Sequence, residues 1–191
     1  QKRARHYDAA PSMSAQEYNH REEKFTMLLR LRKIEEQMAA TKNDPDAEKE
    51  FLELVRGQEG TLADDQRCSK VLERLVALLS TGGLLELGRP LLCGFEQLAR
   101  SPYASHVLQS WVHAVWPHLN LRSNEDACKE LGGLVESAAR SLCGDPASSA
   151  QSLPLLLQDS CGTHPVRSLL LCLGGFTPTG SRASATGANA K

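Results

Sequence analysis

The sequence predicts an all-α fold of stacked helical repeats, an α-solenoid, and three observations support this class. Nowhere do apolar and polar residues alternate with a period of two over six residues, so strands are not expected. Apolar residues recur at helical spacing through most of the stretch 15–173. A short motif returns after 36 residues and again after a further 58. A period near 36, with two or three helices in each unit, is typical of an α-solenoid.

Composition limits the classes of protein to which this chain can belong. Its 191 residues suit one domain with flexible ends, and 41% hydrophobic residues with only 5% aromatics predict a core of leucine, alanine and valine. A net charge of −1 argues against binding nucleic acid by bulk charge alone. No apolar run reaches the length of a membrane span, so we expect no membrane partner. The chain starts with Gln1 without a signal-peptide pattern, so we expect a fragment or a processed product.

The six cysteines do not form a disulfide framework or a metal site. They show no CxxC pair and no Cys/His cluster with zinc spacing, so we expect no metal and no cofactor. We interpret them as reduced, mostly buried thiols, which places the chain in the cytosol or nucleus. They are Cys68, Cys93, Cys128, Cys143, Cys161 and Cys172.

Two helices are predicted in the first third of the chain. Ser14 and Glu17 have capping-box spacing, which marks the start of a helix over 15–40. One face of that helix is apolar at steps of four, three and four residues, formed by Met27, Leu31, Ile34 and Met38. A break over 43–46, which contains a proline, separates it from a second helix that ends near Arg56.

Further helices follow to residue 173, and the two ends of the chain are expected to be disordered. Glycines and prolines are taken as the main boundaries between these helices. The predicted helices are 62–80, ended by Thr81-Gly82-Gly83; 90–100, opened by Pro90; 103–116, ended by Pro117; 125–142, weakened by Gly132-Gly133; 153–158; and 163–173.

Three segments carry the repeated motif. Each has a small residue, then a polar residue, then a basic or imidazole side chain, two residues that are mostly apolar, and a polar residue. A leucine-rich helix continues each one. The segments are 66–73, 102–109 and 160–167.

This pattern resembles the Pumilio (PUF) repeat, in which three positions at the start of the second helix meet one RNA base. Residues at i and i+4 lie one turn apart on the same helix face, and the side chain at i+1 projects beside them. The resemblance implies three RNA-binding triplets: Ser69, Lys70 and Glu73; Ser105, His106 and Gln109; Thr163, His164 and Arg167.

Over residues 46–175 the chain is more specifically similar to the amino-terminal repeats of the nucleolar protein nine family. Shared features are the phrases around the three triplets, the ending Leu173-Gly174-Gly175 and the long connection between the second and third repeats. The resemblance implies a nucleolar, RNA-binding repeat protein that acts in small-subunit ribosomal RNA processing and ribosome biogenesis. Its expected partners are single-stranded or structured pre-ribosomal RNA and pre-ribosomal proteins, and we expect a monomer without enzymatic activity.

The resemblance also implies roles for individual residues. Ser69 with Glu73 is similar to a guanine-reading pair, and Ser105 with Gln109 to an adenine-reading pair. Lys70 cannot stack as an aromatic ring does, so we expect it to contact phosphate, together with Arg67. Arg167 is not a usual base reader, and Pro165 is tolerated in a first helical turn.

The predicted organisation has four parts. Residues 43–66 carry eight acidic and two basic residues, so we expect this segment to lie away from the RNA-binding face. The predicted parts are a basic disordered tail over 1–14, a helical cap region over 15–60, about three repeats over 61–175 with an insertion near 118–150, and a disordered tail over 176–191. The insertion either extends the helices or forms a separate flap.

Other interpretations remain open at this level. A HEAT or armadillo solenoid that binds protein has a similar period, and the helix over 15–40 can serve as a coiled-coil partner. His106 and His164 contact RNA or pack between helices, whereas Trp111 and Trp116 are expected in the core. Cys161 and His164 lack a third group to orient them, and no catalytic motif is present.

Overall fold

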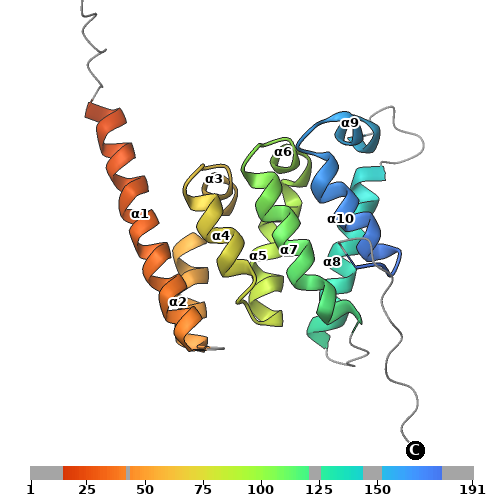
Figure 1. Ribbon diagram of the computed structural model, residues 1–191, viewed down its shortest axis with the longest axis horizontal. Coiled ribbons are helices and arrows are strands. Elements are labelled where there is room, and N and C mark those ends of the chain that lie inside the picture. Colours follow the sequence, from red (N-terminus) through yellow and green to blue (C-terminus); the bar gives the residue numbers. More distant parts are fainter. Residues whose placement is uncertain (1–14, 42–43, 121–125, 144–151, 178–191) are drawn as a thin grey trace, which may run out of the picture.

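The computed structural model describes residues 15–41, 44–120, 126–143 and 152–177, and this part of the chain is built from α-helices (Figure 1). The predicted all-α class is confirmed. The helices are α1 (Ala15–Ala40), α2 (Pro45–Val55), α3 (Glu59–Ala63), α4 (Cys68–Val76), α5 (Thr81–Cys93), α6 (Phe95–Ala99), α7 (Ala104–Asn120), α8 (Asp126–Cys143), α9 (Ser152–Gln158) and α10 (Thr163–Leu173).

The helices form two layers. In the first layer α1, α4, α7 and α10 stand side by side, and each packs against the next (Figure 1). In the second layer α5 packs against both α2 and α8. The short helices α3, α6 and α9 line one end of the first layer (Figure 1). Each of the first two repeats therefore contains a short helix, a first-layer helix and a second-layer helix, as a solenoid requires.

The first two helices agree with the sequence-based expectation. Leu31 and Ile34 of α1 are fully buried, and Met38 is nearly so. The second helix begins at Pro45, where the carboxylate Oδ1 of Asp44 accepts hydrogen bonds from the N–H groups of Asp46 at 3.1 Å and Ala47 at 3.2 Å. Ser14, the predicted cap of the first helix, lies outside the described residues.

The prediction of one helix over 62–80 is wrong. The chain makes a turn between α3 and α4 and another between α4 and α5. One helix ends at Ala63 and the next begins at Cys68. Thr81-Gly82-Gly83 does not end a helix but opens α5. Ser80 makes this possible, because its Oγ accepts the N–H of Gly83 at 3.2 Å and donates to Glu48 Oε1 at 2.5 Å.

The predictions based on proline are also wrong. Pro90 lies inside α5 rather than opening a helix, and α6 is a separate short helix. The seventh helix continues through Pro117 to Asn120. Both prolines are exposed, as are the residues four positions earlier whose carbonyls lose a helical hydrogen bond. Water can replace the missing donor there, so the helices continue.

In the described residues, the extra length between the second and third repeats extends the helices. Helix α7 has 17 residues where α4 has 9, and α8 has 18 where α5 has 13. The eighth helix packs against α5 and α7 as the second-layer helix of the second repeat. Residues 121–125 and 144–150 of the predicted insertion lie outside the described residues.

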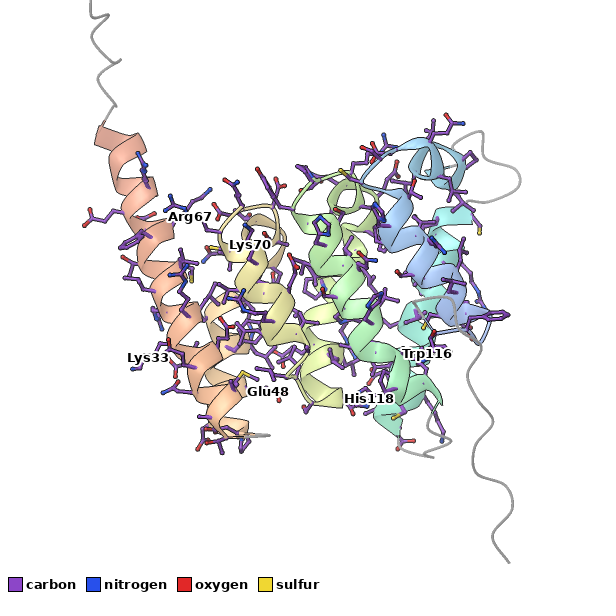
Figure 2. The ribbon with its side chains drawn as sticks, viewed as in Figure 1. Lys33, Glu48, Arg67, Lys70, Trp116 and His118 are labelled. Atoms are coloured by element: carbon purple, nitrogen blue, oxygen red, sulfur yellow. The ribbon has the colours of Figure 1, made fainter. Side chains whose placement is uncertain are left out.

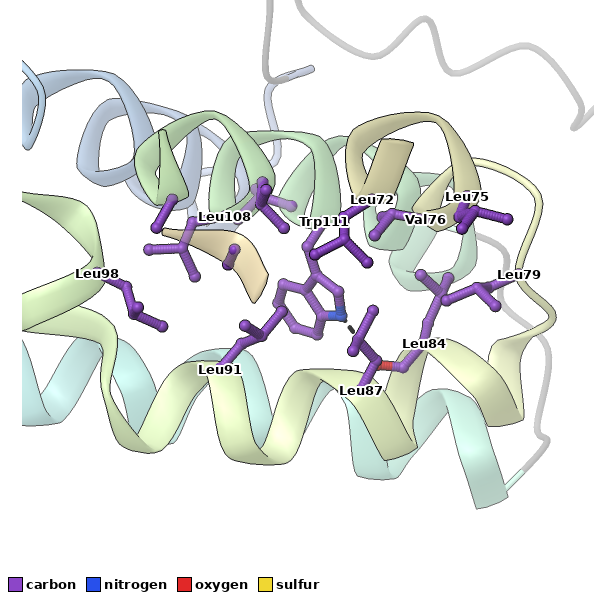
Figure 3. Packing of buried hydrophobic residues seen from close by; sticks show 14 of the residues in the cluster. Leu72, Leu75, Val76, Leu79, Leu84, Leu87, Leu91, Leu98, Leu108 and Trp111 are labelled. Carbon is purple, nitrogen blue, oxygen red and sulfur yellow. Dashed lines mark hydrogen bonds between the residues drawn. The ribbon is translucent and has the colours of Figure 1, made fainter. Parts of the chain in front are cut away.

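Trp111 joins the two layers at the centre of the core (Figure 3). Its side chain is fully buried, and its indole Nε1 donates a hydrogen bond to the carbonyl of Leu84 at 2.8 Å. The ring lies against Gly88, where an added Cβ would stand 2.3 Å from the ring atom Cζ2. The expected core position of Trp111 is confirmed, and Trp116 is half-buried against the same core.

Replacing Gly88 with alanine tests this contact. We expect Gly88→Ala to lower the free energy of unfolding by about 1–3 kcal/mol, since the added methyl group overpacks the Trp111 ring. Gly133→Ala is the matched control, because no atom lies within 4 Å of its added Cβ. That change should raise stability by up to about 1 kcal/mol through helix propensity. Urea unfolding followed by circular dichroism measures both, and equal stability of Gly88→Ala and wild type would contradict the contact.

Candidate nucleic-acid interface

The three predicted triplets occupy equivalent places in the structure. Each begins in the first turn of a first-layer helix, on α4, α7 and α10. Helix α7 packs against both α4 and α10, so the triplets lie on adjacent helices of one layer (Figure 2). The structure thus brings together residues that the sequence separates by 36 and 58 positions.

The three positions of a triplet differ in exposure. The first position is covered: Ser69 is 1% and Ser105 2% exposed. Thr163, the third of these, is half-buried, and its hydroxyl donates to the carbonyls of Asp159 at 2.7 Å and Leu157 at 3.1 Å. The predicted contact of these hydroxyls with a base therefore stays a prediction.

The second and third positions are the accessible ones. At the second position Lys70, His106 and His164 are all exposed. At the third position Glu73 and Gln109 are half-buried, whereas Arg167 is exposed. Among the ion pairs of the described residues, none involves a triplet side chain. A ligand that crosses the three helices would therefore meet cationic and imidazole groups first.

A polar residue closes the turn that leads into each of these helices, and the sequence analysis missed it; we call it the cap residue. The cap stands four residues before the first triplet position, and its side-chain oxygen accepts the backbone N–H groups two and three residues later. The caps are Asp65, with Arg67 at 2.9 Å and Cys68 at 3.1 Å; Ser101, with Tyr103 at 3.1 Å and Ala104 at 3.0 Å; and Asp159, with Cys161 at 2.9 Å and Gly162 at 2.7 Å.

The backbone repeats this geometry. The first residue of each triplet donates its N–H to the carbonyl of the cap residue, at 2.9 Å in the first repeat, 3.2 Å in the second and 3.1 Å in the third. The three triplets are therefore held in the same register relative to their turns. An acceptor side chain at one constant offset in all three segments was the signal in the sequence that could have revealed the caps.

Polar contacts hold neighbouring first-layer helices together. Arg74 of α4 pairs with Glu35 of α1, with 2.9 Å between Nη2 and Oε2. Lys24 of α1 lies 3.7 Å from Asp65. On the other side, the Ser168 hydroxyl lies 3.4 Å from His113 Nε2, which joins α10 to α7. The hydroxyl of the cap Ser101 also bonds to Asp64, so the second helix start is tied to the first repeat.

The turn before α4 sets the charge states of two of its side chains, the Asp65 carboxyl and the Cys68 thiol. Partial burial alone would raise the pKa of the Asp65 carboxyl, but hydrogen bonds from the backbone of Cys68 and Arg67 and the charge of Lys24 hold its pKa below the ordinary value. Burial, with the nearby Asp65 charge, raises the pKa of the Cys68 thiol to about 11. At neutral pH the thiol is therefore neutral and the carboxylate charged.

The acidic segment predicted to avoid this face lies only partly behind it, because Asp65 of the same segment stands just before α4. Four acidic residues of the segment belong to α2, a second-layer helix: Asp46, Glu48, Glu50 and Glu53. Of the three triplets, only the first contains an acidic residue, Glu73. The first layer therefore offers more positive than negative charge at the triplets.

The cysteines and the other possible metal ligands show no arrangement typical of a catalytic or metal site in the described residues. The thiol of Cys161 lies 3.9 Å from the hydroxyl of Ser160, and Cys161 meets His164 through a backbone hydrogen bond. All six cysteines are free, but only Cys68, Cys128 and Cys172 are buried. The prediction of mostly buried thiols is wrong for Cys93 and Cys143, which are exposed. In the described ranges no cluster of three or more His, Cys, Asp or Glu could hold a metal ion. None of the helices described is both long and apolar enough to cross a bilayer.

The fold and the repeated helix starts define the chain as a PUF-type helical-repeat protein. The solved structure described as APUM23-GGAGUUGACGG has this fold, with a TM-score of 0.57 and 22% identity over 74% of this chain and 26% of that one. A family model described as NOP9-like PUF repeat domain matches residues 57–191. The chain therefore belongs to the NOP9-like PUF repeat family. Both the resemblance to Pumilio repeats and the more specific one to the nucleolar protein nine family are confirmed.

Two curated relatives are similar to the chain over part of its length. Nucleolar protein 9 of Yarrowia lipolytica is 30% identical over 142 residues, which is 71% of this chain and 19% of the relative. Nucleolar protein 9 of Clavispora lusitaniae is 44% identical over 59 residues, 31% of this chain and 8% of the relative. The chain spans at most about a fifth of the length of these relatives. The matching family model belongs to the PUF class, which favours the Pumilio interpretation over the HEAT or armadillo one.

The Asp65 cap can be tested through pH. Asp65→Ala should lower stability by about 1 kcal/mol, whereas Asp65→Asn keeps an acceptor and should lose less. Because the folded pKa of Asp65 is lowered, its charge stabilises the fold above the ordinary value of 3.8, and this contribution is lost as pH falls through the folded pKa. In urea unfolding between pH 3 and pH 7, the free energy of unfolding of Asp65→Asn should fall less at the acid end than that of wild type. Identical pH profiles would contradict the assignment.

Proposed function

We propose that the chain binds single-stranded RNA across the face of its first layer that carries the three triplets. The observation that carries this proposal is the equivalence of three helix starts on adjacent helices, each with an exposed cationic or imidazole residue. Single-stranded recognition by helical repeats uses such side chains, one set for each base. Membership of the PUF repeat family supports it, as does the resemblance to APUM23 in complex with an oligonucleotide that contains uracil.

Each triplet position has its own role in this proposal. The imidazoles of His106 and His164 stack on bases, and the ammonium group of Lys70, with Arg67, contacts phosphate. Gln109 reads the edge of an adenine and Glu73 that of a guanine, with the neighbouring serines Ser105 and Ser69 as second contacts. Since these serines are covered, the third position is expected to contribute more of the edge contact.

The third triplet departs from the first two. In this proposal Thr163 mainly supports the helix start, because its hydroxyl donates to two backbone carbonyls. Arg167 is exposed and charged. We propose that it contacts phosphate or stacks its guanidinium on a base, which makes this repeat the least selective for sequence.

The names of the relatives support a proposal for the cellular role. Both are named Nucleolar protein 9, which supports a place in the nucleolus and a role in pre-ribosomal RNA processing and small-subunit ribosome biogenesis. Pre-ribosomal RNA and pre-ribosomal proteins are the proposed partners, the chain acts as a monomer, and it binds without catalysis. In this proposal residues 61–175 form the binding repeats and 15–60 the helical cap, between segments 1–14 and 176–191.

Fluorescence anisotropy tests RNA binding at the second triplet. The full chain is titrated into fluorescein-labelled GGAGUUGACGG and a random single-stranded RNA pool of the same length. We expect micromolar binding that His106→Ala/Gln109→Ala weakens about 5- to 150-fold, since losing one base stack costs about 1–3 kcal/mol. Ser137→Ala on α8 in the second layer is the control and should leave the affinity unchanged. If His106→Ala/Gln109→Ala binds RNA as tightly as Ser137→Ala and wild type, the assigned site is wrong.

Salt dependence tests the predicted phosphate contact of Lys70. Lys70→Ala should weaken binding to both RNAs alike and reduce the slope of log K against log salt by about 0.7–1. Lys129→Ala removes the same charge from the second-layer helix α8 and is the matched control. Equal slopes for the two variants would place the phosphate contacts elsewhere.

A further inference from the structure

A cavity of about 640 Å³ lies between the first helix of the chain and the start of α4. This volume falls in the range of about 300–1,000 Å³ that is common for small-molecule sites. None of the residues that line it belongs to a triplet, and α1 carries no repeat motif. Its lining includes Arg21, Glu22, Lys24, Phe25 and Leu28 of α1, and Asp65 and Arg67 just before α4.

The apolar part of this cavity comes from α1. Leu28 is only 4% exposed, so it belongs to the core at the base of the cavity. Phe25, one turn earlier, is 51% exposed, and its ring is therefore available at the rim. An exposed aromatic ring beside a cavity is the group on which single-stranded nucleic acids stack their bases, largely independently of base identity.

The polar part carries an excess of positive charge. Three basic and two acidic side chains line the cavity. The carboxylate of Asp65 is already paired with Lys24 at 3.7 Å and bound by two backbone N–H groups. Arg67 lies on the side of α4 that faces α1, next to Lys70 of the first triplet (Figure 2). Charge complementarity therefore favours a phosphate-bearing ligand over an acidic or purely apolar peptide.

The cavity also continues the proposed RNA-binding surface. The first helix packs against α4 in the same layer in which α4 packs against α7. Lys70 stands less than one turn after Arg67, so one extended ligand could contact the triplet and the cavity in succession. A chain of nucleotides that leaves the first triplet toward α1 would arrive at Phe25.

We propose that this cavity binds one further nucleotide of the single-stranded RNA, with the base stacked on Phe25 and its phosphate held by Arg67. The inference rests on the proposed function and extends it, because it assigns RNA contact to a helix without a repeat motif. It makes α1 a sequence-tolerant extension of the binding face rather than only a cap of the core.

Anisotropy with the full chain and the random 11-nucleotide RNA pool tests this site. Phe25→Ala should weaken binding about 5- to 150-fold, which corresponds to the loss of one base stack. Phe25→Trp keeps a stacking surface and should bind within about twofold of wild type, and its tryptophan fluorescence should be quenched by RNA more strongly than that of wild type. Leu29→Ala is the matched control, since Leu29 is 49% exposed on the same helix but does not line the cavity. Circular dichroism should show unchanged melting for all three variants.

The outcomes separate this site from the proposed function. If wild type binds and His106→Ala/Gln109→Ala weakens binding while Phe25→Ala does not, the cavity is not an RNA site and the triplets stand. Equal losses for Phe25→Ala and Leu29→Ala would also overturn it, because they indicate general apolar contact by α1. If wild type binds no RNA at high micromolar concentration, both the proposed function and this site are wrong.

Discussion

The contact between the Trp111 indole and the backbone at Gly88 is the constraint on which the rest of the structure depends. The ring fills the space between the layers, and its N–H reaches the carbonyl of Leu84, so it fixes α7 of the second repeat against α5 of the first. Buried tryptophan contributes a large apolar area together with one directional hydrogen bond. The distance between repeats, and hence the spacing of the triplets on α4 and α7, follows from this packing.

Most of the fold could be predicted where local pattern decides structure. The apolar stripe of α1 and the start and end of α10 were predicted correctly because each helix buries one continuous face. The boundaries near Ser80 could not be predicted, since Glu48, 32 residues earlier, supplies the acceptor that orders the turn. The helix boundaries predicted at Pro90 and Pro117 were wrong for a similar reason. A helix can continue through a proline where that face meets water, and the sequence alone does not say which face is exposed.

The site was predictable in its register but not in its exposure. A motif at a constant offset places equivalent residues on neighbouring helices, and the structure has that arrangement for all three triplets. That Ser69 and Ser105 are covered depends on how closely adjacent helices pack, which a single sequence does not encode locally. The role inferred for Phe25 has the same origin, because its cavity exists only where α1 meets α4.

The long first helix has a consequence for the order in which the chain can fold. Its buried stripe, which includes Leu31 and Ile34, packs against α4 as well as α2. Since chains emerge from the ribosome at about 5–20 residues per second, α1 waits on the order of seconds before residues 68–76 are made. During that interval its apolar face is only partly covered, so α1 is open to aggregation and to chaperones while the repeats are being synthesised.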